Sequence, residues 1–256
     1  MQRTRIIPTL LLQDGGLVKT IKFKNPKYVG DPINAVRIFN EKEVDELVLL
    51  DIKATIEKAE PNFKEIEEIV SEAFMPIGYG GGINKIEHVE KLFKIGIEKI
   101  ILNSAAFTNE KLIQEASNIY GNQSIVVSID VKKDLWGEYN IYTHSGSKKV
   151  KGNLIEIVNK FQNLGAGEIL INSIDKEGTM TGYDIALIEK VSKELNIPVI
   201  ASGGAGGIKD FVSAIKFGAS AVAGGSIFIY QGVHRAVLIS YIKSQSVENK
   251  IKKNNL

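Results

Sequence analysis

An internal repeat constrains the fold of this chain more than any other feature of its sequence. Residues 197–228 follow a pattern of short apolar strand, glycine-rich turn, helix ended by glycine, second strand and Gly-Ser turn. Residues 75–104 follow the same pattern, and positions 82 and 204, 96 and 218, and 104 and 226 each lie 122 residues apart. Glu46 and Glu168 have the same spacing, and each opens an apolar run. The chain is therefore predicted to consist of two similar halves.

Each half has room for four strand–helix units, and eight such units close into a parallel barrel. We therefore predict an α/β protein, a single (β/α)8 TIM barrel built from two similar half-barrels. The length of 256 residues agrees with the roughly 250 residues typical of this fold. The barrel is expected over residues 1–245, and a polar, Lys/Asn-rich C-terminal tail over residues 246–256.

Local signals predict several elements within this frame. Asp31-Pro32 is typical of a helix N-cap followed by proline at the first helical position, so a helix is expected to run to about residue 41. Hairpins are expected in the long loop 13–30 and in the polar and aromatic insertion 134–151. Further helices are predicted over residues 61–74, 109–120, 153–164, 183–195 and 234–244.

Composition argues against several classes of protein. Hydrophobic residues make up 44% of the chain, enough for a large core, and the net charge is only +2. These values give no reason to expect nucleic-acid or membrane binding. The absence of cysteine excludes disulfides, thiolate metal sites and a cysteine nucleophile. No apolar run reaches membrane-spanning length and no signal peptide opens the sequence, so we expect a cytoplasmic enzyme.

The glycine-rich turns are candidates for binding anions. In such a barrel the active groups lie at the C-terminal ends of the strands, where these turns offer backbone N–H groups and hydroxyls. The alternative is that the glycines only permit tight turns, but their recurrence in both halves favours two facing phosphate sites. The residues concerned are Gly82, Asn103 and Ser104 in the first half, and Gly203, Gly204, Gly225 and Ser226 in the second.

Three aspartates also lie at these strand ends or in the loops that follow. Asp130 ends a buried strand, where an unpaired carboxylate is costly, so it suits general acid–base catalysis, with a capping or salt-bridge role as the alternative. Asp51 has the same alternatives, and Lys19 and Lys53 are near it in sequence. Asp175 lies in a loop rich in turn residues, where it could also serve as a capping residue.

A second set of charges stands at the opposite end of the predicted barrel. Arg5, Glu46, Lys99 and Glu168 begin strands one, two, four and six. Features at this end of a barrel usually concern stability, so spacing alone favours a charge-balanced plug.

Together these residues resemble the cyclase subunit of imidazole glycerol phosphate synthase, from Arg3 to about Tyr241. The resemblance covers nearly the whole chain. It is carried by Gly15 to Lys19, Gly30-Asp31-Pro32, Asp45 to Asp51, Gly80-Gly81-Gly82-Ile83, Asn103-Ser104-Ala105-Ala106, Gly165 to Leu170, Ser173-Ile174-Asp175, Gly178-Thr179, Gly182-Tyr183-Asp184 and Ala201 to Gly206.

The resemblance implies a barrel that docks a glutaminase subunit on its N-terminal face and passes ammonia along its axis to a phosphorylated substrate. It implies that the four charges form the ammonia gate rather than a plug. It also implies that Asp130 is one of two catalytic aspartates, and that Lys19, Asp51 and Asp175 belong with the substrate-binding residues. No cofactor and no metal site is expected.

The sequence departs from the family at the other catalytic aspartate. The first-strand aspartate of the family falls on Leu11, and the internal repeat aligns residues 9–13 with 128–132, so that Leu11 corresponds to Asp130. Leucine cannot accept a proton. The run from Leu10 to Thr20 resembles a paralogous branch associated with glycosyl amidation in surface-polysaccharide synthesis.

Three functions are therefore considered. The first is a cyclase-like barrel that channels ammonia from a glutaminase to a separate sugar amidotransferase. The second is the histidine-pathway cyclase, a lyase, with an altered site. The third is a noncatalytic partner that binds and activates a glutaminase.

Overall fold

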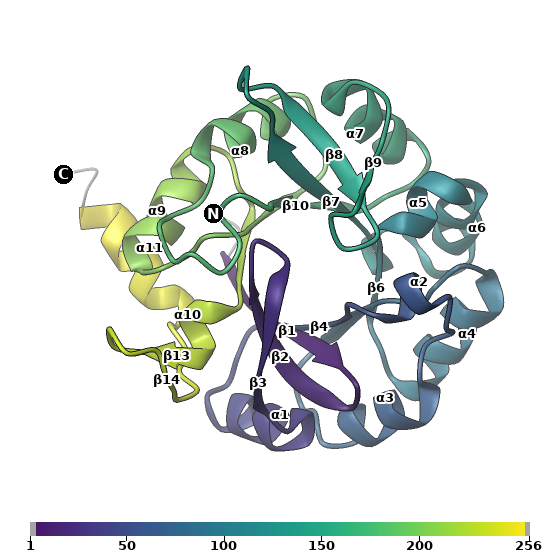
Figure 1. Ribbon diagram of the computed structural model, residues 1–256. Coiled ribbons are helices and arrows are strands. Elements are labelled where there is room, and N and C mark those ends of the chain that lie inside the picture. Colours follow the sequence, from purple (N-terminus) through teal and green to yellow (C-terminus); the bar gives the residue numbers. More distant parts are fainter. Residues whose placement is uncertain (1–3, 254–256) are drawn as a thin grey trace.

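The computed structural model describes residues 4–253, which form a closed parallel barrel surrounded by helices (Figure 1). Its strands are hydrogen-bonded in the order β10-β11-β12-β1-β4-β5-β6-β7, and β7 pairs with β10 to close the ring. The prediction of a (β/α)8 TIM barrel is confirmed. The barrel strands are β1 (Arg5–Gln13), β4 (Leu47–Asp51), β5 (Ile77–Gly80), β6 (Lys99–Leu102), β7 (Ile125–Lys133), β10 (Glu168–Ser173), β11 (Val199–Ser202) and β12 (Ala221–Gly224).

Helices alternate with these strands, and several start or end within two residues of the predicted limits. Asp31 caps the first helix through Asn34 N–H, with proline at the first helical position as expected. Within residues 4–253 no helix is long and apolar enough to cross a membrane. The helices are α1 (Pro32–Glu41), α2 (Ala54–Glu57), α3 (Phe63–Val70), α4 (Ile86–Ile95), α5 (Ser104–Thr108), α6 (Lys111–Tyr120), a 3₁₀ turn (Asn122–Ser124), α7 (Leu154–Asn163), α8 (Ile185–Ser192), α9 (Ile208–Lys216), α10 (Ser226–Ile229) and α11 (Ser244–Lys253).

Side chains alternate between the two faces of each barrel strand, so the apolar residues form two separate cores. In β1, Ile6 and Leu10 belong to the larger core beneath the helices, whereas Ile7 belongs to a smaller cluster inside the barrel. Residues from seven strands fill that interior, which is why the strands are apolar on both faces. The interior cluster consists of Ile7, Val48, Ile101, Val126, Leu170, Ile200, Ala221 and Ala223.

Two hairpins extend the barrel at its carboxyl-end face, as predicted. β2 (Gly16–Ile21) and β3 (Lys24–Gly30) follow β1 and reach toward the centre of the barrel in the view of Figure 1. Lys22 and Phe23 form their two-residue turn with positive φ, the geometry that suits the twist of a tight hairpin. β8 (Tyr139–Thr143) and β9 (Lys148–Lys149) follow β7.

The predicted helix over residues 234–244 is wrong. The chain instead forms a third hairpin, β13 (Tyr230–Gln231) with β14 (Ala236–Val237), and the last helix begins only at Ser244. Gly232 and Arg235 have φ values of 69° and 50°, which turn the chain back and are incompatible with a helix. Val247 of α11 is fully buried, so the boundary expected at residue 245 falls inside a packed helix.

Candidate functional site

A pocket lies at the carboxyl ends of the strands, and residues from all eight barrel strands line it. Asp175 lies outside this lining, where its carboxylate accepts a hydrogen bond from Lys133 N–H at 2.9 Å. The structure therefore brings together the other predicted catalytic and substrate-binding residues, but not Asp175. Those that line the pocket are Leu11, Lys19, Asp51, Gly82, Asn103, Ser104, Asp130, Gly203, Gly204, Gly225 and Ser226.

Asp130 is buried at this pocket, with 8% of its surface exposed. Each carboxylate oxygen accepts one amide hydrogen bond, from Asn172 Nδ2 at 2.9 Å and from Asn103 Nδ2 at 3.1 Å. Burial raises the pKa of Asp130 to about 6; the negative charge of Glu177 adds to this rise, and the two amide hydrogen bonds oppose it. A carboxyl group with a pKa near neutrality is suited to proton transfer.

Strand register shows that Leu11 and Asp130 are equivalent positions of the two halves. β1 pairs with β4 so that Leu11 lies beside Leu50, and β7 pairs with β10 so that Asp130 lies beside Asn172. Positions 50 and 172 lie 122 residues apart, so the repeat relates one pair to the other. The pocket wall is therefore apolar in the first half where it is polar and acidic in the second.

The residues next to Leu11 do not replace the missing carboxylate. Gln13 and Asp14 are absent from the pocket lining. Asp14 instead forms an exposed ion pair with Lys53 at 2.9 Å, and this hydrogen-bonded lysine lowers the pKa of Asp14. Neither residue is positioned for proton transfer inside the pocket.

The two glycine turns line the pocket in a backbone conformation that requires glycine. Gly82 and Gly204 have φ values of 69° and 111°, a region that favours glycine. A Cβ atom would lie 2.8 Å from Ala59 O at the first position and 2.2 Å from Gly182 O at the second, so no side chain fits. Close packing therefore explains the glycine at each turn, and the phosphate sites stay a prediction.

The neighbouring Asn-Ser and Gly-Ser pairs begin two short helices at the pocket. α5 and α10 start at Ser104 and Ser226 without a side-chain cap, which leaves backbone N–H groups of each first turn without a capping partner. The side chains of the first pair are engaged within the protein. Asn103 holds Asp130, and Ser104 Oγ accepts the N–H of His144 at 3.1 Å. If an anion binds at the predicted site, backbone N–H groups are therefore its expected donors.

Lys19 is buried in the wall between the two halves. Its ammonium group donates to Thr9 O at 2.7 Å, and a Cβ atom on Gly225 would lie 2.2 Å from its Nζ. Burial lowers the pKa of Lys19 to about 8, although the negative charge of Glu177 opposes the shift. Lys19 is thus a cation held at the pocket by close packing, with a proton that it loses more easily than an exposed lysine does.

Asp51 acts as a helix cap in this structure. Its Oδ1 accepts the N–H groups of Lys53 and Ala54, both at 2.9 Å, at the start of α2. This is the structural role that the sequence left open, although Asp51 also lines the pocket.

Several pocket residues were not predicted from the sequence, and Glu177 and Asn172 bear most directly on Asp130. Glu177 lines the pocket, its carboxylate accepts Phe23 N–H at 3.1 Å, and burial raises its pKa. Glu177 lies two residues after Asp175, and no pattern in the sequence favours one of these two loop carboxylates over the other. Asn172 could have been found by alternation, because it lies four residues after Glu168 on the same face of β10.

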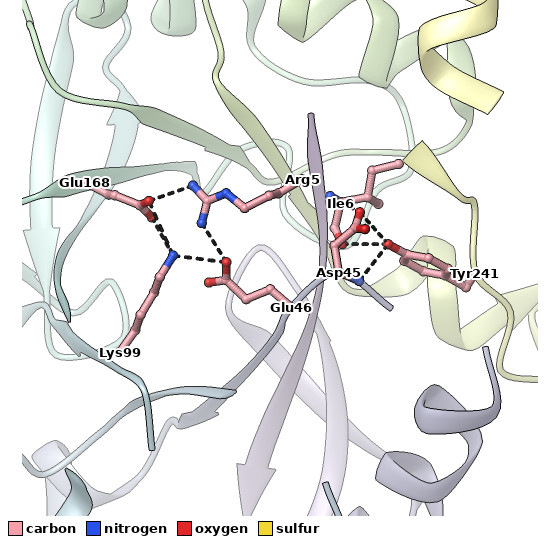
Figure 2. Close-up of polar contacts among 7 residues, drawn as sticks. All are labelled: Arg5, Ile6, Asp45, Glu46, Lys99, Glu168 and Tyr241. Carbon is pink, nitrogen blue, oxygen red and sulfur yellow. Dashed lines mark hydrogen bonds and ion pairs between the residues drawn. The ribbon is translucent and has the colours of Figure 1, made fainter. Parts of the chain in front are cut away.

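The four charges at the other end form a closed ring around the barrel axis (Figure 2). Arg5 donates to Glu46 at 2.6 Å and to Glu168 at 2.7 Å, and Lys99 contacts the same two carboxylates at 3.0 and 3.2 Å. Burial acts to lower the pKa of Arg5, but the charges of Glu168 and Glu46 outweigh it and raise that pKa. The predicted ring is confirmed as a geometric feature.

A tyrosine from the C-terminal segment braces the strands beside this ring. The Tyr241 hydroxyl lies 2.9 Å from Asp45 Oδ2 and 3.1 Å from Ile6 O, and it accepts Asp45 N–H (Figure 2). Asp45 Oδ2 also accepts Ile6 N–H at 3.2 Å. Because Ile6 and Asp45 each adjoin a ring residue, these bonds fix the starts of β1 and β4.

Comparison with known proteins gives the family. Residues 5–235 match the sequence model of the family described as histidine biosynthesis protein. The chain belongs to this family. A relative in Pseudomonas aeruginosa, provisionally named imidazole glycerol phosphate synthase subunit hisF2, is 51% identical across 94% of this chain and 96% of its own length. Imidazole glycerol phosphate synthase subunit HisF of Petrotoga mobilis is 42% identical across 92% and 94%.

Within the histidine biosynthesis protein family, this chain is a HisF-like, cyclase-type synthase subunit. A relative in Leptospira interrogans, provisionally named subunit HisF, is 47% identical over 97% of the chain and 98% of its own length. The resemblance drawn from the motifs is confirmed. The roles of individual site residues and the branch within the family stay predictions.

Proposed function

We propose that this HisF-like chain receives ammonia from a glutaminase bound at its N-terminal face and supplies it for amidation of a sugar in surface-polysaccharide synthesis. The observation that carries this proposal is Leu11 in register with Leu50, where the other half has Asp130 and Asn172. Cyclisation with loss of a carboxamide fragment requires proton transfer on both sides of the substrate. Loss of one positioned acid–base group costs about 10²–10⁴-fold in rate.

The order of residues along four strands supports the proposed path for ammonia. On β1 the inward positions run from Arg5 through Ile7 to Thr9, from the ring through the interior cluster to the pocket. The other strands repeat this order from Glu46, Lys99 and Glu168. A neutral molecule such as ammonia crosses an apolar layer far more readily than an ion does. The ring faces the end of the barrel where the glutaminase is proposed to bind.

The names of relatives also favour a paralogous branch. The proteins of Pseudomonas aeruginosa and Vibrio vulnificus, 51% and 48% identical, carry the numbered subunit names hisF2 and hisF3. Their names are provisional assignments to imidazole glycerol phosphate synthase. The unnumbered HisF proteins of Petrotoga mobilis and Helicobacter hepaticus are 42% and 40% identical.

The histidine-pathway cyclase is the second candidate. It is favoured by Asp130 with its pKa near neutrality and by the paired glycine turns that suit a substrate with two phosphates. A steady-state assay with the imidazole precursor and ammonium salt at alkaline pH separates the two candidates. Turnover within about tenfold of the median enzyme value of roughly 10 s⁻¹ would return the chain to histidine biosynthesis.

Reconstitution tests the proposal directly. The chain, its cognate glutaminase and a sugar amidotransferase of surface-polysaccharide synthesis are mixed with glutamine, and amidated sugar is measured. Product is expected only when all three proteins are present, and the chain and glutaminase should co-elute one to one. If the chain activates glutamine hydrolysis but the ammonia appears in solution and not in amidated sugar, the chain is a noncatalytic activator instead.

A further inference from the structure

Most of the large apolar side chains that are exposed to solvent lie in segments that follow the carboxyl ends of barrel strands. Of the eleven exposed within residues 4–253, only Phe74, Ile119 and Phe217 lie in segments that lead into a strand. Patches of exposed apolar side chains mark surfaces that bind another molecule. The other eight are Ile21, Tyr28, Ile56, Leu135, Trp136, Val233, Val237 and Leu238.

The most exposed neighbouring pair forms the tip of the β7–β8 hairpin. Leu135 and Trp136 are 97% and 85% exposed. Asp134 builds this turn, because its carboxylate accepts the N–H groups of Trp136 at 3.0 Å and of Glu138 at 2.9 Å. The turn therefore does not depend on either apolar side chain, and leaving both in water is unfavourable. Tryptophan is a residue that frequently dominates the binding energy of protein interfaces.

The β13–β14 hairpin presents a second apolar tip at the same end of the barrel. Arg235 ties it to the loop after β10 by donating to Thr179 O at 3.3 Å. Val233 in its turn is 93% exposed, and Leu238 beside β14 is 63% exposed. In Figure 1 this hairpin and the β7–β8 hairpin stand at separate places around the barrel. A partner that contacts both tips has to span this face.

Lysines gather on the two hairpins that follow β1 and β7. Segments 22–28 and 132–151 hold eight lysines and two acidic residues, a net charge of +6 in a chain whose total is only +2. Among residues 4–253 only Lys133 of these eight forms an ion pair, with Asp184 at 3.1 Å. The remaining positive charge favours a partner with an acidic surface. The eight are Lys22, Lys24, Lys27, Lys132, Lys133, Lys148, Lys149 and Lys151.

The same hairpins border the pocket. Phe23 of the β2–β3 turn and Ser145 of the turn between β8 and β9 both line it. These two turns meet, because a Cβ atom on Gly146 would lie 2.9 Å from the Phe23 ring. A protein seated on the hairpins therefore lies next to the pocket, where it would shield a product leaving the barrel from water.

We propose that the hairpins β2–β3, β7–β8 and β13–β14 form a docking surface for the enzyme that consumes the ammonia. This partner has an acidic surface and an apolar recess that receives Trp136. Its identity as the ammonia consumer rests on the proposed function, whereas the surface belongs to this chain alone. A second copy of the chain fits less well, because two equally basic faces repel one another.

The single tryptophan of the chain permits a direct test. The full chain is labelled with 5-fluorotryptophan and bound to its unlabelled cognate glutaminase, and an unlabelled sugar amidotransferase of surface-polysaccharide synthesis is added. The fluorine resonance of Trp136 is expected to shift or broaden with the amidotransferase but not with the glutaminase alone. No response to the amidotransferase overturns the proposal. So does an equal response to phosphatidylglycerol vesicles or to a higher concentration of the chain itself, which would assign the surface to a membrane or a second copy.

Substitutions at the surface give the second test, with affinity measured by titration calorimetry. Trp136→Ala is expected to weaken binding of the amidotransferase at least about tenfold. Lys148→Glu combined with Lys149→Glu should weaken it at low salt, and the difference should shrink as salt is added. Phe74→Ala is the matched control, because Phe74 is 91% exposed in the loop that leads into β5. Native affinity in both surface variants overturns the proposal.

The outcomes separate this surface from the proposed function. A complex that binds the amidotransferase through Trp136 but yields no amidated sugar contradicts the proposed function and leaves the docking surface standing. Conversely, amidation that proceeds equally well with Trp136→Ala, without a response of the fluorine resonance in the native chain, contradicts the docking surface alone.

Discussion

Asp130→Asn is expected to stabilise the protein at pH 8 and to lose that advantage toward pH 4. The native carboxylate is buried without a cation, so ionising it costs folding free energy that an amide does not incur. Asn172 can rotate its amide to present the unpaired Oδ1 to the new side chain. The substitution therefore keeps a hydrogen-bonded pocket while it removes the charge.

The size of the effect follows from the pKa of Asp130. That pKa rises from an ordinary value of 3.8 to about 6 in the folded protein. Two pKa units correspond to about 3 kcal/mol. The folded state holds the proton of Asp130 more tightly than the unfolded chain does, so protonated Asp130 contributes this stability below about pH 4. The contribution is lost as pH rises through about 6. One weakened hydrogen bond costs about 1 kcal/mol, which leaves a net gain of about 2 kcal/mol at pH 8.

Urea unfolding of both proteins at pH 4, 6 and 8 in sodium buffer measures this difference. The difference in free energy of unfolding between the native protein and Asp130→Asn should change by about 3 kcal/mol from pH 4 to pH 8. Asp14→Asn serves as the control, because Lys53 lowers the pKa of Asp14 and its replacement should give no gain at pH 8. A difference between native protein and Asp130→Asn that stays constant with pH would refute the reasoning.

Three further substitutions test other parts of the barrel. Lys99→Ala should leave glutaminase activity intact but release ammonia to solvent, measured as free ammonia per amidated product, whereas Lys94→Ala should not. Leu11→Asp should raise turnover of the imidazole precursor at least about tenfold, recovering part of the 10²–10⁴-fold loss. Gly204→Ala should destabilise the fold by about 1–3 kcal/mol in urea unfolding, because its Cβ would lie 2.2 Å from a carbonyl oxygen, whereas Gly207→Ala has open space.

The repeat made the barrel and the charge ring predictable. A constant spacing of 122 residues carries register information, and register decides which side chains share a face. Glu46 and Glu168 therefore had to lie at equivalent positions, and the ring follows once Arg5 and Lys99 begin their strands on the same end. The alignment of Leu11 with Asp130 rested instead on the match of residues 9–13 with 128–132, which lie 119 residues apart, and the strand pairing agrees with it.

Features outside the repeat were harder to predict. The hairpin after α10 depends on left-handed φ at Arg235, a residue that composition gives no reason to place there. Asp175 and Glu177 lie two residues apart in one turn, and only the fold shows that Glu177 reaches the pocket while Asp175 binds a backbone N–H. Loop carboxylates have no periodicity, so sequence cannot choose between them.

Comparison of the two halves separates scaffold from chemistry within one chain. The scaffold recurs closely: a Cβ on Gly81 would lie 2.6 Å from Asp51 O, and a Cβ on Gly203 would lie 2.6 Å from the corresponding Ser173 O. These repeated glycine turns are what the proposed anion sites need, and the charge ring draws one glutamate from each half.

The acid–base groups do not recur, because leucine stands where the second half has Asp130. A barrel that keeps the ring, the apolar interior and the repeated glycine turns, but has a carboxyl group on one side only, fits the proposed delivery of ammonia better than it fits cyclisation. Cyclisation needs a second group, and in this pocket the equivalent position is apolar. Restoring a carboxylate at Leu11 while keeping Asp130 is therefore the change that best distinguishes delivery of ammonia from cyclisation.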